Sequence, residues 1–185
     1  AGMAADLYET YVVTVVAAML LAFTVYGVGS PAIVFPMVIG GVSIIASVIG
    51  TYFVRLGKGD YVMGALYKGL IVSGVLAIIA FWPLANKFMA GVASKAAQGA
   101  VGFAIPPMNV FLLAVIGVAL TGLIVAITEY FTSKSFNPVK SIAKASTTGH
   151  GTNVIQGLAM SMKSTAAPVI VIVVAILAAF HLGGG

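Results

Sequence analysis

Long apolar segments separated by shorter, more polar stretches dominate the chain. Five such segments are present, at about residues 1–26, 31–54, 62–85, 108–132 and 152–182. A helix needs roughly 20 consecutive apolar residues to cross the hydrocarbon core of a membrane. The pattern therefore predicts an all-α, multi-pass transmembrane helical bundle of about five helices, as a single transmembrane domain over residues 1–185.

Glycine, proline and basic residues mark the breaks between these segments. The first break carries Gly27 and Pro31, and the second lies at 55–60. We expect a longer loop at 86–107, where small residues are frequent and a short surface helix could form, and another at 133–151, where Asn-Pro is typical of a turn. The last segment exceeds the thickness of a bilayer core, so its first turns should project beyond the lipid.

Small residues recur through the second apolar segment. They are Gly40, Gly41, Ser43, Ala46, Ser47 and Gly50. In lipid, small side chains allow two helix backbones to approach closely. This spacing favours helix packing over the lining of a pore.

The composition excludes a soluble domain, because 61% of the residues are hydrophobic and only 7% are charged. The chain has no cysteine, which excludes disulfides, thiolate metal sites and cysteine nucleophiles. The net charge of +5 arises from basic residues between the apolar segments. No basic cluster alternates with aromatic residues, so we expect no nucleic-acid partner and assign these charges to membrane topology.

The basic residues also predict an orientation. One set of loops with adjoining residues contains Arg55, Lys58, Lys68, Lys134, Lys140 and Lys144, whereas the loop after the third segment contains Lys87 and Lys95. Basic residues accumulate on the cytoplasmic side of membrane proteins. The loops near Lys58 and Lys140 are therefore predicted to be cytoplasmic, the Lys95 loop external, and the start of the first segment close to the cytoplasmic side.

Asp6 and Glu9 head the first apolar segment, and their spacing of three places them on one helix face. An ionisable residue inside a span is costly and normally faces a bundle interior or an ion path. The alternative is that both are first-turn acids that favour the positive end of the helix and are wetted at the interface. The spacing would allow the two carboxylates to share one cation or proton.

Three other polar residues are weaker candidates. His150 has no acidic neighbour or second ligand at metal-binding spacing, so we assign its loop to backbone shape, with Thr152 or Asn153 capping the last helix. Glu129 is expected to be a solvated or loop-tethering acid, and Lys163 to lie near the interface. We predict no catalytic residue and no metal ligand within this chain.

Two blocks of sequence resemble one family. Residues 2–11, Gly-Met-Ala-Ala-Asp-Leu-Tyr-Glu-Thr-Tyr, resemble the segment after the second aspartate-rich motif of membrane-integral, ion-pumping inorganic pyrophosphatases. The family usually has Phe where this chain has Tyr8. A second block resembles the same family at 127–132, 137–139 and 148–159. The main departure there is Met162-Lys163, near which many members carry an acid.

The resemblance implies an internal fragment of a homodimeric pump with about sixteen helices per subunit, in the cell (inner) membrane. Such pumps couple the hydrolysis of inorganic pyrophosphate to the transport of H+ or Na+ and require Mg2+, whose aspartate ligands would lie outside this chain. Asp6 and Glu9 would form the ion gate, and the fragment alone should be inactive. A fragment of a secondary ion-coupled transporter with an intramembrane Asp/Glu pair is the alternative.

Overall fold

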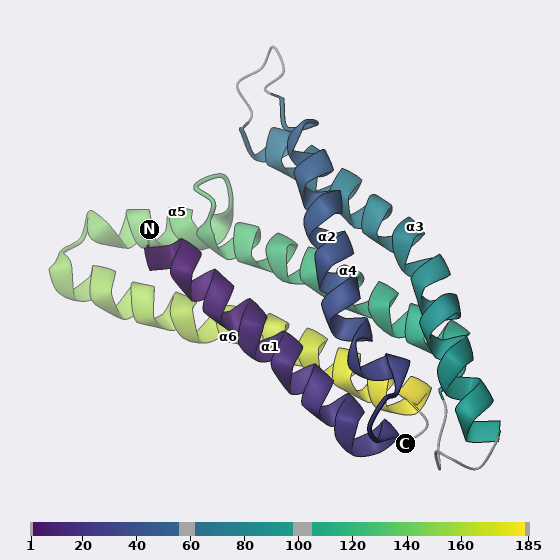
Figure 1. The fold of residues 1–185 in the computed structure, drawn as a ribbon. Coiled ribbons are helices and arrows are strands. Elements are labelled where there is room, and N and C mark those ends of the chain that lie inside the picture. The colour runs from purple at the N-terminus through teal and green to yellow at the C-terminus, as the bar shows by residue number, and fades with distance from the viewer. Residues whose placement is uncertain (1, 56–61, 98–104, 184–185) are drawn as a thin grey trace. The chain divides into compact units, whose positions relative to one another are not determined.

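The computed structural model describes residues 2–55, 62–97 and 105–183, and these residues form helices without a strand. The elements are α1 (Gly2–Tyr26), a short 3-10 helix η1 (Pro31–Ile33), α2 (Phe35–Thr51), α3 (Val62–Ala97), α4 (Pro107–Thr132), α5 (Asn137–Ser146) and α6 (His150–Gly183) (Figure 1). They divide into two compact units, Ala1–Ala114 and Val115–Gly185. The expectation of a single transmembrane domain stays a prediction.

Four of the described helices are long and apolar enough to cross a membrane. The candidate spans are Ala4–Tyr26 in α1, Val62–Val92 in α3, Pro107–Ser146, which covers α4 and α5, and His150–Gly183 in α6. The apolar helix α2 is shorter, with 17 residues. The structure therefore confirms the prediction of an all-α membrane fold.

The second apolar segment was predicted as one helix over 31–54, and this was wrong. Two helices form instead, because Pro31 stands at the start of η1 and Pro36 at the start of α2. Proline fits the first turn of a helix, because the N–H that it lacks would have no partner within the helix there. The Ser30 hydroxyl caps η1 by accepting the backbone N–H of Ala32 at 3.4 Å.

The third helix was predicted to end at residue 85, with a loop over 86–107. Helix α3 instead continues through Pro83 to Ala97. Beyond Pro83, Ala85, Met89 and Val92 repeat at helical spacing and are buried. Met89 and Val92 pack in a core cluster with Ala32 of η1. This apolar stripe explains why the helix extends beyond the predicted end.

In the first unit, α2 and α3 cross at a point where neither backbone carries a large side chain. A Cβ atom added to Gly50 would lie 2.8 Å from the Cβ of Ser73 and 3.0 Å from the carbonyl oxygen of Gly69. A Cβ on Gly40 would overlap the Tyr11 hydroxyl of α1. The predicted close packing is thus confirmed at Gly40 and Gly50, whereas Gly41 faces open space.

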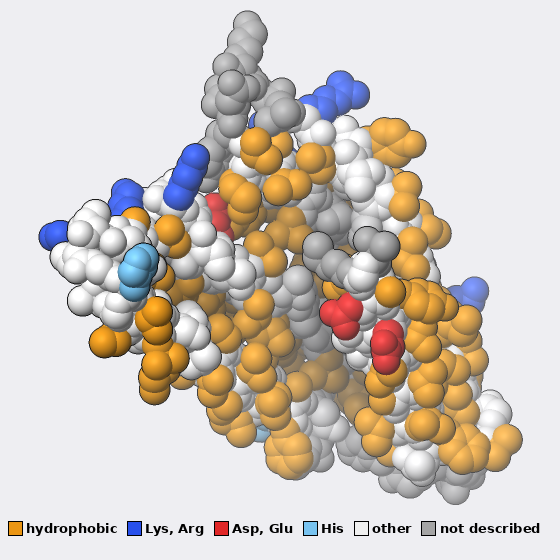
Figure 2. All heavy atoms as spheres, turned by 90° about the vertical axis from the view of Figure 1, so that its left-hand side faces the viewer, with side chains coloured by type: hydrophobic (Ala, Val, Ile, Leu, Met, Phe, Trp, Pro, Cys, Tyr) orange, Lys and Arg blue, Asp and Glu red, His pale blue; other side chains and the backbone are white. Residues whose placement is uncertain are grey.

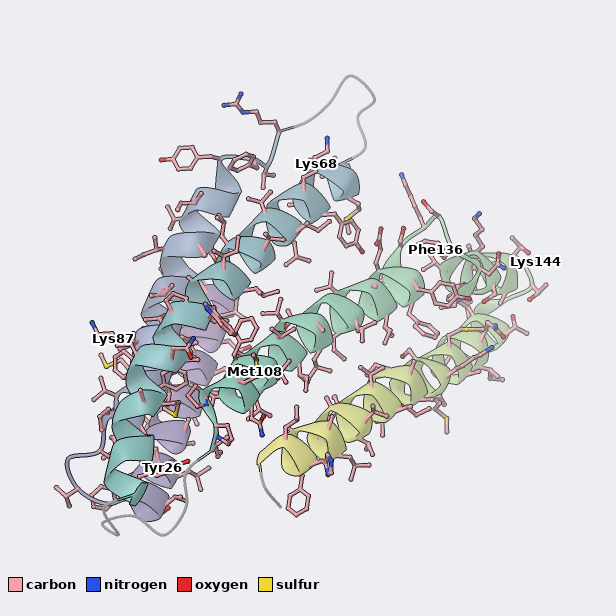
Figure 3. All side chains as sticks on the ribbon, turned by 90° about the vertical axis from the view of Figure 1, so that its right-hand side faces the viewer. Tyr26, Lys68, Lys87, Met108, Phe136 and Lys144 are labelled. Carbon is pink, nitrogen blue, oxygen red and sulfur yellow. The ribbon has the colours of Figure 1, made fainter. Side chains whose placement is uncertain are left out.

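The segment 133–151 was predicted as a loop but contains the helix α5. Asn137-Pro138 begins this helix rather than making a turn, and Pro138 is buried in its first turn. The rings of Tyr130 and Phe136 lie 5.3 Å apart at the junction between α4 and α5. Figure 3 labels Phe136 here and Lys144 on α5.

Helix α6 begins at His150, so the predicted N-cap at Thr152 or Asn153 was wrong. The helix begins earlier because Gly149 adopts a φ of 134°, which places its carbonyl over the first turn. That carbonyl accepts the Asn153 N–H at 3.2 Å and the Thr152 hydroxyl at 2.8 Å. The same hydroxyl also lies 3.1 Å from the Ala145 carbonyl of α5, so its single proton is shared between the two carbonyls and links α5 to α6.

Candidate functional site: the carboxylate face of α1

Asp6 and Glu9 lie in the second and third turns of α1, inside a helix of membrane-spanning length. Both side chains are exposed within the described chain. Figure 2 shows acidic side chains at the surface among hydrophobic ones. The structure therefore places both predicted ion-path residues on one helix, three positions apart, as the sequence predicted.

The opposite side of α1 packs against its own unit. Tyr11 contacts Gly40, while Ala22 and Tyr26 pack on the core cluster of Ala32, Met89 and Val92. The Tyr26 hydroxyl also makes a hydrogen bond with the backbone of Ile105. Tyr11, Ala22 and Tyr26 thus form a packed stripe along one side of α1.

The carboxylates lie away from that stripe. Asp6 is nine residues before Val15, and Glu9 is nine residues before Ala18; both of these apolar residues are partly buried. Nine residues make about two and a half turns of an α-helix, so the members of each pair lie on opposite sides. The packing that fixes α1 thus leaves the acidic face open.

Hydroxyl groups follow the carboxylates along α1 but donate to their own helix. The Thr10 hydroxyl donates to the Asp6 carbonyl at 2.9 Å, and the Thr14 hydroxyl donates to the Thr10 carbonyl at 2.7 Å. Both hydroxyl oxygens keep lone pairs that can accept a further bond. Among the described residues, neither Asp6 nor Glu9 has an ion-pair partner.

The described residues do not form a metal site. Over 2–55, 62–97 and 105–183, no three His, Cys, Asp or Glu residues lie together in a way that would hold a metal ion. A divalent oxygen-coordinated site such as that of Mg2+ needs clustered carboxylates. These residues therefore do not fit a Mg2+ site, and Asp60 lies outside the described residues.

A cleft of about 400 Å3 lies between α4 and α6. Its walls combine apolar side chains with hydroxyls, from Ile127, Thr128, Phe131, Thr132, Ser164, Thr165, Pro168 and Val169. The Thr132, Ser164 and Thr165 hydroxyls donate to carbonyls of their own helices. Among the described residues that line this cleft, none is ionisable, so the cleft does not resemble an ion-binding or catalytic site.

The remaining candidates lie apart from the carboxylates in the chain. His150 and Lys163 are exposed on α6, and Glu129 is partly buried near the end of α4. Glu129 has an interaction partner in the structure. Neither the described histidines nor Glu129 belongs to a group that could bind a metal.

Membrane-spanning helices, close packing through glycine and a carboxylate pair inside one span define an α-helical integral membrane protein. The family described as inorganic H+ pyrophosphatase matches residues 1–185, and the chain belongs to this family.

Several relatives share this sequence. The chain is 48% identical over 170 residues to pyrophosphate-energized proton pump 2 of Mycoplana dimorpha, covering 90% of this chain and 80% of the relative. It is 42% identical over its whole length to a K(+)-insensitive pyrophosphate-energized proton pump of Methanosarcina mazei. A second K(+)-insensitive pump, from Moorella thermoacetica, is 39% identical over 99% of this chain. The chain spans 25% of each of the last two relatives.

Proposed function

We propose that this chain is part of a membrane pump that couples the hydrolysis of inorganic pyrophosphate to the translocation of H+ or Na+. The family match and the names of the relatives support this proposal. A secondary ion-coupled transporter would also use intramembrane carboxylates, but it leaves the match over residues 1–185 unexplained.

The observation that carries the proposal is the open carboxylate face of α1. A charged group inside a span costs roughly 2.5–3.5 kcal/mol on insertion scales, so it is retained where it faces a bundle interior or a water path. Asp6 and Glu9 lie opposite the packed stripe, where a bundle of further helices can enclose them. We therefore assign both residues to the ion path.

Two carboxylates one helical turn apart repel each other when both are ionised in a medium of low dielectric constant. A single proton or Na+ held between them removes that repulsion. In the proposed role, Asp6 and Glu9 hold the ion together and release it when the surroundings of α1 change. Thr10 is placed to add a hydroxyl oxygen next to this pair.

The proposal places no Mg2+ ligand among the described residues, since these do not form a suitable cluster. Mg2+ would neutralise the charge of pyrophosphate in the complete pump, held by residues outside this chain. The chain by itself should therefore be inactive in hydrolysis. We further propose a homodimer in the cell membrane.

Ion-flux measurements on vesicles reconstituted with the complete pump test the role of the acids. Asp6→Asn and Glu9→Gln should each impair transport, because either change removes half of the shared ion site. Val25→Ala, at an exposed apolar position of the same helix away from the acidic face, is the control and should pump normally. Normal transport by both acid variants would show that these acids only contact the interface.

The proposed orientation has a separate test. The chain contains no cysteine, so a single cysteine placed in it reacts without interference from this region. Cysteine at position 140, on α5, should react with an impermeant reagent from the cytoplasmic side, and cysteine at 95 from outside. The corresponding position at Lys58 lies outside the described residues and should behave like 140. Strong labelling of position 140 from outside would reverse the orientation.

A further inference from the structure

Helix α5 divides cleanly into two sides. Pro138 is buried, and Ser141 and Ala145 are partly buried, so positions three and four apart form an inner side. Lys140 and Lys144 are four residues apart, lie on the other side of the helix and are exposed. The short helix is thus amphipathic, with a pair of ammonium groups on its outer side.

The inner side of α5 is already occupied by α6. The Gln156 side-chain amide donates to the Ser141 hydroxyl at 3.2 Å, and the Thr152 hydroxyl donates to the Ala145 carbonyl at 3.1 Å. These contacts come from the first turns of α6. They fix α5 against α6 and leave the lysine side facing outward.

The length of α6 indicates that this part of the second unit lies beyond the hydrocarbon core. Helix α6 has 34 residues, which at about 1.5 Å each give roughly 51 Å against a core of about 30 Å. Its uninterrupted apolar stretch begins after Pro168. The turns that hold α5 therefore emerge from the lipid, and α5 lies at the level of the head groups. Tyr130 and Phe136, the aromatic pair beside α5, suit that level.

Glu129, which has an interaction partner, is the last acidic residue of the sequence and lies five positions before Lys134. From residue 130 to the last residue, the sequence contains four lysines and no aspartate or glutamate. Three of the lysines, at 134, 140 and 144, lie between α4 and α6 or on α5, and all three are exposed. Lys–phosphate attraction near a membrane surface is strong because anionic lipids carry the opposite charge. The charge and the level of α5 together match a phospholipid head group.

We propose that Lys140 and Lys144 of α5, with Lys134 beside them, bind the phosphate groups of anionic phospholipids in the leaflet that contacts this end of the protein. The helix would hold a small set of such lipids at the α4–α6 hairpin. This site does not depend on the roles of Asp6 and Glu9 or on which ion is pumped.

The test uses the complete pump in lipid nanodiscs of phosphatidylcholine with increasing phosphatidylglycerol, and native mass spectrometry counts the phosphatidylglycerol that stays bound. A lysine near an anionic surface strengthens binding about fivefold, so Lys140→Gln with Lys144→Gln should weaken retention by up to about 25-fold. The double arginine variant keeps both charges and should retain the lipid. Lys87→Gln, which removes an exposed charge from α3, is the matched control and should change nothing.

Three results would overturn the inference. In the first, the wild-type pump retains phosphatidylcholine and phosphatidylglycerol equally. In the second, the glutamine variants retain phosphatidylglycerol like the wild type. In the third, the glutamine variants lose thermal stability in pure phosphatidylcholine while their phosphatidylglycerol binding is unchanged. That outcome would show that the lysines pair with an acidic protein segment. Single glutamine variants, each expected to lose about fivefold, guard against a folding defect in the double variant.

Discussion

The two units of the chain carry their charged side chains at different places along their helices. In the first unit, Asp6 and Glu9 lie within a helix of membrane-spanning length and on its open side. In the second unit, the lysines at 134, 140 and 144 come after the last residue of α4 and before the start of α6. The acids occupy positions where charge is expensive, whereas these lysines occupy positions where it costs little.

The units also differ in how they pack. Apart from Pro138 of α5, the strongly buried apolar side chains of the described residues, from Ala32 to Val92, belong to the first unit. In the second unit, the helices α4 and α6 contain no buried residue. Within a membrane, the first unit is therefore held by close backbone contacts, and the second by the hydrogen bonds between α5 and α6. Asp6 and Glu9, whose charges are expensive within a span, thus belong to the unit whose helices pack more closely.

The largest effect should follow from neutralising Asp6. Asp6→Asn removes a charge that the helix carries at high cost, and it should abolish ion transport and severely lower hydrolysis of the complete pump. Lys140→Gln, which removes a charge outside the spans, should leave hydrolysis within about twofold of wild type. Phosphate release in detergent measures both. Equal losses in the two variants would break the comparison between the units.

Glu9→Gln should have a smaller and different effect. The variant keeps Asp6 and a polar group at position 9, so hydrolysis should stay within about tenfold of wild type, a change of about 1.4 kcal/mol in the barrier. The ratio of ions transported to pyrophosphate hydrolysed, and its dependence on Na+ and pH, should change. An unaltered ratio together with an unaltered ion dependence would remove Glu9 from the ion path.

Substitution at the α2–α3 crossing tests the packing difference. Gly50→Ala places a methyl group 3.0 Å from the Gly69 carbonyl oxygen, and such overpacking costs about 1–3 kcal/mol. Gly41→Ala is the control, because nothing lies within 4 Å of its added Cβ. The apparent melting temperature of the complete pump in detergent should fall only for the Gly50 variant. Equal melting temperatures would show that this crossing does not determine stability.

The smallest effect should come from the α5–α6 junction. Thr152→Val removes the hydroxyl that bonds the Ala145 and Gly149 carbonyls and should cost about 1 kcal/mol. Thr165→Val removes only a bond to the Met162 carbonyl within the same helix and should cost less. Hydrogen exchange of the α5 amides should rise for the Thr152 variant alone. Similar exchange in both variants would mean that this hydroxyl does not hold α5.

Much of the fold follows from the sequence because hydropathy over 20 or more residues is a strong signal. It gave the membrane class and the approximate position of each span. It failed where a local signal was ambiguous. Asn137-Pro138 was interpreted as a turn, although proline also suits the first turn of a helix, and burial of Pro138 against its unit selects the helix.

Helix ends were harder to predict for a related reason. The stretch after Pro83 carries small residues and lysines, which lower its hydropathy, but Met89 and Val92 repeat at helical spacing and find a partner in Ala32. A hydropathy profile averages over a window of residues, so it does not detect a few apolar residues at helical spacing among polar ones. The partner lies more than 50 positions earlier in the chain, so only the packed structure shows why α3 continues.

The sequence by itself determined that Asp6 and Glu9 share one side of a helix, because three residues make nearly one turn. It also determined the family, since the matching residues are local in the chain. Only the tertiary structure decided which side of α1 is packed, through the contacts of Tyr11 with Gly40 and of Tyr26 with Ile105. An apolar helix in lipid has hydrophobic residues all round, so its periodicity does not mark the buried side, and the contacts with other helices select it.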